Sequence, residues 1–332
     1  MKPFDVVAIG DTTQDIFLQL SDASVQCDLD GEHCKICLDY ADKIAVDRKT
    51  DVPAVGNAAN HAIGVSRLGA ASALYTVVGE DVQGKLAVDV LKDNGVDARY
   101  VVFDQERGTN FSAVINFRGE RTILVYHEPR AYRLPRLDTP RWLYLTSAAS
   151  EGVEALHAQV LEYLGRSPDV RLAFNPGTHQ LHLGKDKLLP LLARSDVLFL
   201  NREEAAEVLG LPGDDVAALL EGFHELGVKI MVLTDGPDGS YASGSQQAWQ
   251  LPIFAGPVIE RTGAGDAFGS GFLAALVAGK SLYEAMLWGN ANSTSVVQYV
   301  GAREGLLTVE GVEKIIAENP GIKPVAFNKH GR

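Results

Sequence analysis

Short apolar runs alternate with stretches of helical length along most of this 332-residue chain. The clearest apolar runs are residues 4–9, 142–145, 170–174, 196–200 and 229–233. Amphipathic stretches predict helices near residues 57–68, 82–94, 151–165, 202–209, 214–226, 265–279 and 308–318. Unbroken apolar runs suit strands that are buried on both faces of a parallel sheet. The alternation therefore predicts an α/β fold, with a doubly wound, mainly parallel sheet and helices on both faces.

Two segments interrupt this alternation. Residues 18–54 contain no good helix, and residues 109–127 form an expected hairpin with strands at 111–117 and 122–126. We expect them to pair into a small β-sheet that projects as a lid. The chain then divides into a core of residues 1–17, 55–108 and 128–332 and a β-lid of residues 18–54 and 109–127. Exposed edge strands can pair between subunits, so a homodimer through the lid is one expected assembly.

Polar or glycine-rich clusters follow successive expected strands. They are residues 10–15, 175–177, 201–204, 234–236 and 262–266, the last of which follows an expected strand at 258–260. Ligands of open parallel sheets bind beyond the carboxyl ends of the strands. The five clusters therefore predict one extended site at that edge of the sheet.

The strongest motif is the glycine-rich turn at residues 261–268, which opens the helix expected at 265–279. Backbone N–H groups at a helix start attract an anion, and Gly263 and Gly265 let the backbone approach a phosphate. Asp266 would repel that anion, so it fits better as a base for an acceptor hydroxyl beside the transferred phosphate. Alternatively, Asp266 caps the helix and the glycines only form a turn.

Acceptor binding is expected from residues that follow the first strand and open the first helix. Asp11 and Asp15 are carboxylates that can each accept two hydroxyls of a sugar, although both also suit turns. Gly56 precedes the 57–68 helix, whose first turn carries Asn60 toward the sheet edge. Asn57 has the alternative role of capping this helix.

A metal ligand is expected at the start of the 202–209 helix. Asn201 is an ordinary N-cap residue there, and Glu204 three positions later completes a capping box. The functional alternative places Glu204 on the water shell of Mg²⁺, which prefers hard oxygen ligands and keeps several of its waters.

The charge balance excludes several other classes. Lys and Arg number 30 against 43 Asp and Glu, for a net charge of −13. An acidic surface repels nucleic acid and anionic membranes, so neither is an expected partner. The P-loop and dinucleotide-binding patterns are not met. With neither a signal-peptide pattern nor a membrane-spanning run recognisable, we expect a cytoplasmic protein that acts on a small molecule.

These motifs resemble a known family. Residues 263–266 resemble the second signature of the ribokinase-like carbohydrate kinases, also called the phosphofructokinase-B family, and residues 56–60 resemble the first. The order of the other clusters matches across almost the whole chain. The resemblance implies a ribokinase-like fold, and transfer of the γ-phosphoryl group of ATP to a primary hydroxyl with Mg²⁺ present.

The resemblance also implies roles for individual residues. The catalytic group would be the base Asp266 and the anion hole of Gly263, Ala264 and Gly265. The acceptor would bind to Asp15, Gly56, Asn57 and Asn60, with Asp11 nearby. Asn175, Asn201 and Glu204 would serve the phosphates and Mg²⁺, and Thr234, Gly236 and Asn292 would lie along the nucleotide.

The chain departs from the family pattern in three places, one of which is a first lid segment that is longer than usual and carries the cysteines. The first signature begins Val55-Gly56 instead of Gly-Gly, and the second is preceded by Glu260-Arg261 instead of Asp-Thr. The latter pair lies near the loop that binds a monovalent cation in some members, so K⁺ activation stays open.

Three functions remain in consideration. The first is a sugar kinase. The second is a nucleoside kinase of the same family, with a base pocket formed by lid aromatics such as Phe17, Phe111 and Tyr126. The third is a non-catalytic sugar- or nucleotide-binding regulator, because fold does not fix function. A regulator has no need of the base Asp266, so this third possibility ranks last.

All three cysteines lie in the first lid segment. Cys34 and Cys37 have the two-residue spacing of a zinc knuckle, and Cys27 with His33 or Asp30 could complete a Zn²⁺ site. The alternative is that Cys34 and Cys37 are small residues within a strand.

Overall fold

A long twisted sheet forms the centre of the molecule in the computed structural model, which describes residues 3–28, 34–118, 120–149, 151–245 and 247–328. Its strand order is β17-β16-β15-β14-β13-β12-β11-β1-β6-β7, and β8 also pairs with β6. The strands are β1 (Val6–Ile9), β6 (Ser72–Gly79), β7 (Val96–Asp97), β8 (Val101–Asp104), β11 (Trp142–Leu145), β12 (Arg171–Phe174), β13 (Val197–Asn201), β14 (Met231–Thr234), β15 (Ser240–Ser243), β16 (Ala248–Leu251) and β17 (Val325–Ala326).

The sheet is parallel from β14 across to β7, and the three strands β15, β16 and β17 pair antiparallel at one edge. β6 and β7, which follow β1 in the sequence, lie on one side of β1 in this sheet. The later strand β11 lies on the other side of β1. Strand order therefore reverses between β1 and β11, which is where ligands bind in doubly wound sheets.

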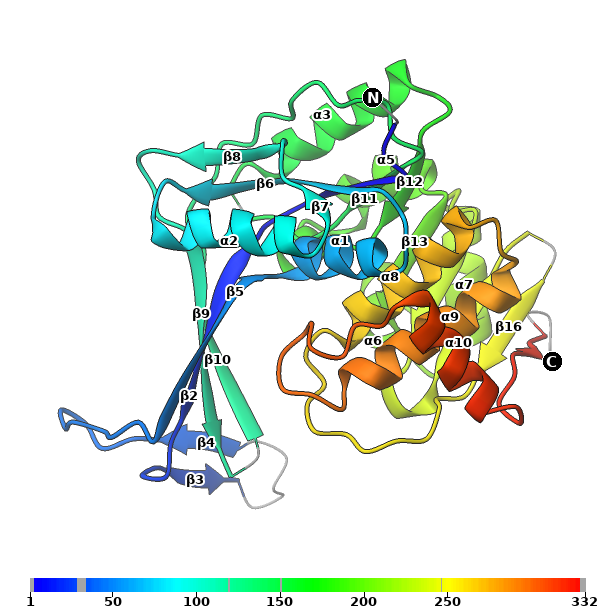
Figure 1. Cartoon of the computed structure of the whole chain (residues 1–332). Helices are drawn as coiled ribbons and strands as arrows, with labels where there is room; N and C mark the ends of the chain where they lie inside the picture. Colours follow the sequence, from blue (N-terminus) through cyan, green and yellow to red (C-terminus); the bar gives the residue numbers. More distant parts are fainter. Residues whose placement is uncertain (1–2, 29–33, 119, 150, 246, 329–332) are drawn as a thin grey trace.

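Helices cover both faces of this sheet, as predicted (Figure 1). One apolar core packs α3 (Val153–Arg166), α5 (Lys185–Arg194), α6 (Arg202–Leu209) and α7 (Val216–Glu225), with the short α4 (Thr178–Leu181) beside them. The other core packs α1 (Asn57–Arg67), α2 (Val82–Asp93), α8 (Ala264–Val277), α9 (Leu282–Val296) and α10 (Val309–Glu318). Within the described part of the chain, no helix is long and apolar enough to cross a membrane.

Two full-length helices are not among the amphipathic stretches identified in the sequence. α9 is buried around most of its circumference against α8, so its sequence has no polar face to mark it. α5 contains Pro190 in its interior, and a proline at such a position disfavours a helix when only the sequence is considered.

The strand expected at 258–260 is wrong. Residues 252–263 cross from β16 to α8 without regular structure, and Val258 and Ile259 are 55% and 62% exposed. Among the residues that the structure describes, no strand pairs with this segment, so its apolar composition was not a sign of a strand.

A separate β-sheet projects from the core as a twisted ribbon, and we call it the lid (Figure 1). Its strand order is β10-β9-β2-β5, and a small hairpin of β3 and β4 lies at its far end. The strands are β2 (Thr13–Gln19), β3 (Ser24–Cys27), β4 (Cys34–Cys37), β5 (Arg48–Val55), β9 (Asn110–Phe117) and β10 (Glu120–Tyr126). The lid sheet thus begins at Thr13, so the acceptor candidate Asp15 lies on a lid strand.

The zinc site expected at the three cysteines is wrong. Cys27 and Cys34 are joined by a disulfide across the β3–β4 pair, so neither has a thiolate for a metal. The described residues contain no cluster of three metal-binding side chains, and the candidate fourth ligands Asp30 and His33 lie outside them. The strand alternative for Cys34 and Cys37 is confirmed.

Candidate active site

The glycine-rich turn places the start of α8 at the edge of the main sheet. Gly263 is the N-cap of α8 with a φ of 77°, and a Cβ added there would overlap Ala302. Glycine is therefore required by both the backbone conformation and the space. The first-turn N–H groups form the positive end of α8. Ala264 already uses its N–H in the turn, donating to the Arg261 carbonyl at 3.3 Å.

Asp266 lies in the first turn of α8 and is 9% exposed. Its Oδ2 accepts a hydrogen bond from Asn60 Nδ2 at 2.9 Å, and the Asn57 side chain also bonds this carboxyl. Burial raises the pKa of Asp266 to about 6, although the two amide donors oppose the shift. Asp266 does not serve as the helix cap, because Gly263 occupies that position without a side-chain bond.

Helix α1 delivers both asparagines to this carboxyl. Gly56 is the N-cap of α1 with a φ of 100°, so the expected capping role of Asn57 is wrong. His61, the next residue after Asn60 on α1, stacks on Tyr144 with ring centroids 3.3 Å apart, and both rings are fully buried. Burial raises the pKa of the Tyr144 phenol, and the nearby Asp266 charge adds to the effect. Neither His61 nor Tyr144 carries a local sequence signal that marks it as part of the site.

Asp11 and Asp15 have different surroundings. Asp11 is 5% exposed and accepts a 2.6 Å hydrogen bond from the Tyr132 hydroxyl, with Asn110 Nδ2 3.5 Å away. Asp15 is half-buried on β2 and hydrogen-bonds Ser112 on the adjacent β9. Asp11 is therefore almost fully buried against Tyr132, whereas Asp15 is the more exposed of the two carboxylates.

Burial raises the pKa of Asp15 to about 6, with Ser112 opposing the shift and the Glu260 charge adding to it. Arg303 and Arg121 lower the pKa by their positive charges. Sequence reasoning missed Ser112 on the adjacent lid strand and Arg303 in a loop near residue 300, and it noted Arg121 only as a lid cation that could favour an acidic acceptor. No spacing in the sequence links these positions.

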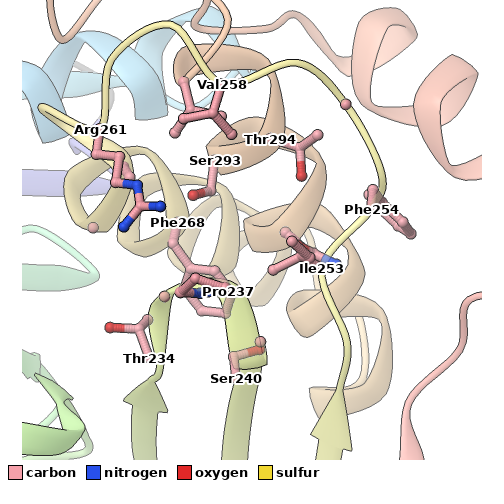
Figure 2. Close-up of a pocket in the computed structure, with 17 residues that line it drawn as sticks. Thr234, Pro237, Ser240, Ile253, Phe254, Val258, Arg261, Phe268, Ser293 and Thr294 are labelled. Carbon is pink, nitrogen blue, oxygen red and sulfur yellow. The ribbon is translucent and has the colours of Figure 1, made fainter. Parts of the chain in front are cut away.

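A cavity of about 270 Å³ opens beside the first turn of α8 (Figure 2). Thr234 and Ser240 lie at the ends of β14 and β15, and Phe268, Ser293 and Thr294 come from α8 and α9. The complete lining is Thr234, Gly236, Pro237, Gly239, Ser240, Ile253, Phe254, Gly256, Val258, Arg261, Ala264, Gly265, Phe268, Asn290, Ser293, Thr294 and Val297. Most of this surface is apolar, which suits a flat ring system.

Of the three residues that the family resemblance implies for the nucleotide, Thr234 and Gly236 line this cavity and Asn292 does not. The Asn292 side chain is fully buried, and its Nδ2 donates to the Ala267 carbonyl at 2.8 Å. Its Oδ1 accepts the Leu307 N–H at 2.9 Å. Asn292 therefore does not line this cavity, because α9 turns it toward α8 and presents Asn290 and Thr294 instead.

Asn201 and Glu204 form a capping box at the start of α6. Asn201 Oδ1 accepts the Glu204 N–H at 2.8 Å, and Glu204 Oε2 accepts the Asn201 N–H at 2.9 Å. Burial raises the pKa of Glu204. One oxygen of this carboxylate remains for a metal-bound water, so both expected roles fit the same side chain. Asn175 lies nearby at the end of β12 and donates weakly to the Phe199 carbonyl, at 3.4 Å.

The site thus combines a buried carboxylate, a positive helix end and an adjoining apolar cavity, an arrangement typical of phosphotransferases. The model of the pfkB family of carbohydrate kinases matches residues 26–309, so the chain belongs to this family. Members are phosphotransferases with an alcohol group as acceptor.

Related proteins cover nearly the full chain. An ATP-dependent 6-phosphofructokinase from Thermoanaerobacterium thermosaccharolyticum is 25% identical over 327 residues, covering 95% of this chain and 94% of the relative. A ribokinase from Arabidopsis thaliana, solved with ribose and ATP, has a TM-score of 0.79 at 23% identity, covering 95% and 99%. The nucleoside kinase of Methanocaldococcus jannaschii has a TM-score of 0.75 at 22% identity, covering 96% and 100%. The likeness to these two structures shows a ribokinase-like fold.

Proposed function

We propose that this protein transfers the γ-phosphoryl group of ATP to a hydroxyl of a sugar or sugar derivative, with Asp266 as general base. The observation that carries the proposal is the position of Asp266, which is buried at the positive end of α8 and has a pKa raised to about 6. A base near neutrality accepts a proton in the transition state and is still ionised at physiological pH.

The proposed reaction divides among three parts of the site. The acceptor hydroxyl loses its proton to the Asp266 carboxylate while its oxygen attacks the γ-phosphorus and ADP leaves. Asp15 and Asn60 orient the other hydroxyls of the acceptor. The N–H groups at Gly263 and Gly265 would face the charge that develops on the transferred phosphoryl group, whereas the Ala264 N–H donates to the Arg261 carbonyl in the structure and would have to leave it to take part. The adjoining cavity takes the nucleotide base, with Thr234 and Gly236 on its wall.

Mg²⁺ fits the donor groups near the start of α6. Glu204 keeps one carboxylate oxygen outside its capping box, and Asn175 and Asn201 supply neutral polar groups beside it. Mg²⁺ would neutralise charge on the phosphates, as it does in other phosphoryl transfers. Glu204 would then hold the ion through one of its waters.

A nucleoside acceptor is the second candidate, and one contact favours it. The rings of Phe111 and Tyr126 lie 5.5 Å apart on the lid and are 39% and 49% exposed, so they offer a stacking surface for a base. Phe17, expected in the same pocket, is 5% exposed and buried in the lid, so that expectation is wrong.

The named activities of the relatives support an ATP donor and leave the acceptor open, since they include a 6-phosphofructokinase, a ribokinase and a nucleoside kinase. The test is a screen of acceptor-dependent ADP release over sugars, sugar acids, sugar phosphates and nucleosides, with Mg²⁺ or EDTA. A sugar or sugar derivative that is phosphorylated only with Mg²⁺ would support the first proposal. A nucleoside as the best acceptor would support the second candidate, and ADP release that no acceptor changes would contradict both.

A further inference from the structure

An ion pair joins the lid to the loop that precedes α8. Arg121 on β10 places its Nη1 atom 2.8 Å from Glu260 Oε1, although the two residues are 139 positions apart in the sequence. The side chains of Arg121 and Glu260 are 30% and 11% exposed, so the pair is partly shielded from solvent. Shielded, hydrogen-bonded ion pairs constrain geometry more than surface pairs do.

Glu260 extends this contact toward the glycine-rich turn. Its second oxygen, Oε2, accepts the Gly301 N–H at 2.8 Å. The next residue, Ala302, packs so closely against Gly263 that a Cβ on Gly263 would overlap it. An unbroken series of contacts therefore connects Arg121 to Gly263. It consists of two hydrogen bonds made by Glu260 and the close packing of Ala302 on Gly263.

The segment around residue 302 is also tied to the other side of the lid. Arg303 Nη2 donates to the Pro53 carbonyl of β5 at 2.6 Å. The Arg303 carbonyl in turn accepts from Arg67 Nη1 of α1 at 3.0 Å. Two lid strands thus hold one short loop, and that loop supports the turn at the start of α8.

We propose that Arg121 is a positioning residue for the phosphate-binding turn. It acts through Glu260 and residues 301–302 to fix Gly263, so the turn is correctly placed only while the lid is in the position seen here. The role rests on the function proposed above. It links the lid, which would contact the acceptor, to the backbone that would bind the transferred phosphoryl group.

The charges around Asp15 fit this coupling. Burial raises the pKa of Asp15, and Glu260 adds to the rise while Arg303 and Arg121 oppose it. The carboxylate that we place on the acceptor therefore shares its electrostatic environment with the ion pair.

The first test needs neither substrate nor activity. Amide exchange of residues 262–266 would be measured in the ligand-free protein for Arg121→Met, Glu260→Gln and Arg118→Met. Arg118 is the matched control, because it precedes β10 and its guanidinium lies over the Phe117 ring within the lid. We expect faster exchange in the first two variants and wild-type exchange in the control. Wild-type exchange at 262–266 in a folded Arg121→Met protein would overturn the proposal, whatever reaction the enzyme performs.

The second test uses steady-state kinetics on an acceptor found in the screen. Arg121→Met should lower kcat about ten- to hundredfold, because small displacements of a catalytic backbone are costly. The KM for the acceptor should change much less. The double variant with Glu260→Gln should be no slower than the slower single variant, since both act on one contact. Effects that multiply would contradict the proposed route through Glu260.

Arg121→Lys keeps the positive charge and guards against a folding defect in the Met variant. We expect its kcat to lie between those of wild type and Arg121→Met. A Lys variant no faster than the Met variant would overturn an electrostatic role for Arg121.

Discussion

Asp266 combines burial with a proposed role that requires its charge. A carboxylate removed from water is destabilised, which is why its pKa rises to about 6. Asn60 and Asn57 donate to it and limit the rise, so the group is still ionised at pH 7. The same two asparagines fix the direction in which the carboxylate points.

Replacing this base tests its role directly. Asp266→Asn keeps an oxygen that can accept from Asn60, so the local structure should persist while the proton acceptor is lost. We expect turnover to fall about 10²–10⁴-fold, the usual contribution of a positioned base. ATP affinity, measured by calorimetry, should change little, because Asp266 is not among the residues that line the cavity. Wild-type turnover on the true acceptor would show that Asp266 is not the base.

The pH dependence follows from the two raised carboxyl pKa values. Asp266 must be ionised to accept a proton, and Asp15 must be ionised to accept two hydroxyls, so both lose function as the pH falls through about 6. We expect log kcat/KM to be flat above pH 7 and to fall below pH 6 with a slope approaching 2. In Asp15→Asn the slope should approach 1. A wild-type profile that stays flat to pH 5 would contradict ionisation of either group as a requirement.

Helix α6 shows how one element can serve stability and function together. The capping box of Asn201 and Glu204 satisfies N–H groups at the start of α6, and the same helix end points toward the carboxyl edge of the sheet. Arg202 pairs with Asp235 at 2.8 Å, which ties this helix start to the end of β14.

Glu204→Gln separates the two roles, because glutamine can also close a capping box. The stability of the protein should therefore stay near that of wild type in a thermal melt. If Glu204 orients a water of Mg²⁺, the Mg²⁺ concentration for half-maximal activity should rise several-fold. An unchanged Mg²⁺ titration would leave Glu204 with its capping role alone.

The whole molecule consists of an α/β core with helices on both faces of its sheet and a lid that projects from the core as a sheet, with no helix among its described residues (Figure 1). The lid has little apolar interior of its own, and strand β10 is exposed along most of its length. A ligand or partner that covers the lid would therefore stabilise this part of the molecule more than it would stabilise the core.

Acceptor binding should order the lid. Closure over the acceptor excludes water, which otherwise competes for the phosphoryl group. We expect amide exchange in β9 and β10 to slow when a verified acceptor is added, with α3 on the far side of the core as an internal reference. Equal exchange with and without the acceptor would rule out this coupling.

We also predict a homodimer that forms through the lid. Leu124, Val125 and Tyr126 on the edge strand β10 are 55%, 61% and 49% exposed, and such edges favour pairing with a second copy. Light scattering should give about twice the chain mass at micromolar concentration, and Leu124→Glu should shift the protein to the monomer. A wild-type protein that is monomeric throughout the concentration range would contradict this assembly.

The sequence by itself determined those features that depend on residues close together in the chain. Apolar runs predicted the central strands, amphipathic periodicity predicted α1, α2, α3, α6, α7, α8 and α10, and the 201–204 spacing predicted the cap of α6. The glycines at 263 and 265 likewise predicted a turn at a helix start. These features follow from local backbone preference and helical or strand periodicity.

Tertiary structure alone decided which distant residues meet. Asn57 cannot be distinguished from a helix cap until α1 and α8 lie side by side, and Asn292 cannot be excluded from the cavity until the rotation of α9 is known. Likewise, neither the Cys27–Cys34 disulfide nor the Arg121–Glu260 ion pair follows from spacing. The physical reason is that the orientation of each element is set by packing against the others, so contacts between elements carry no signature within either segment.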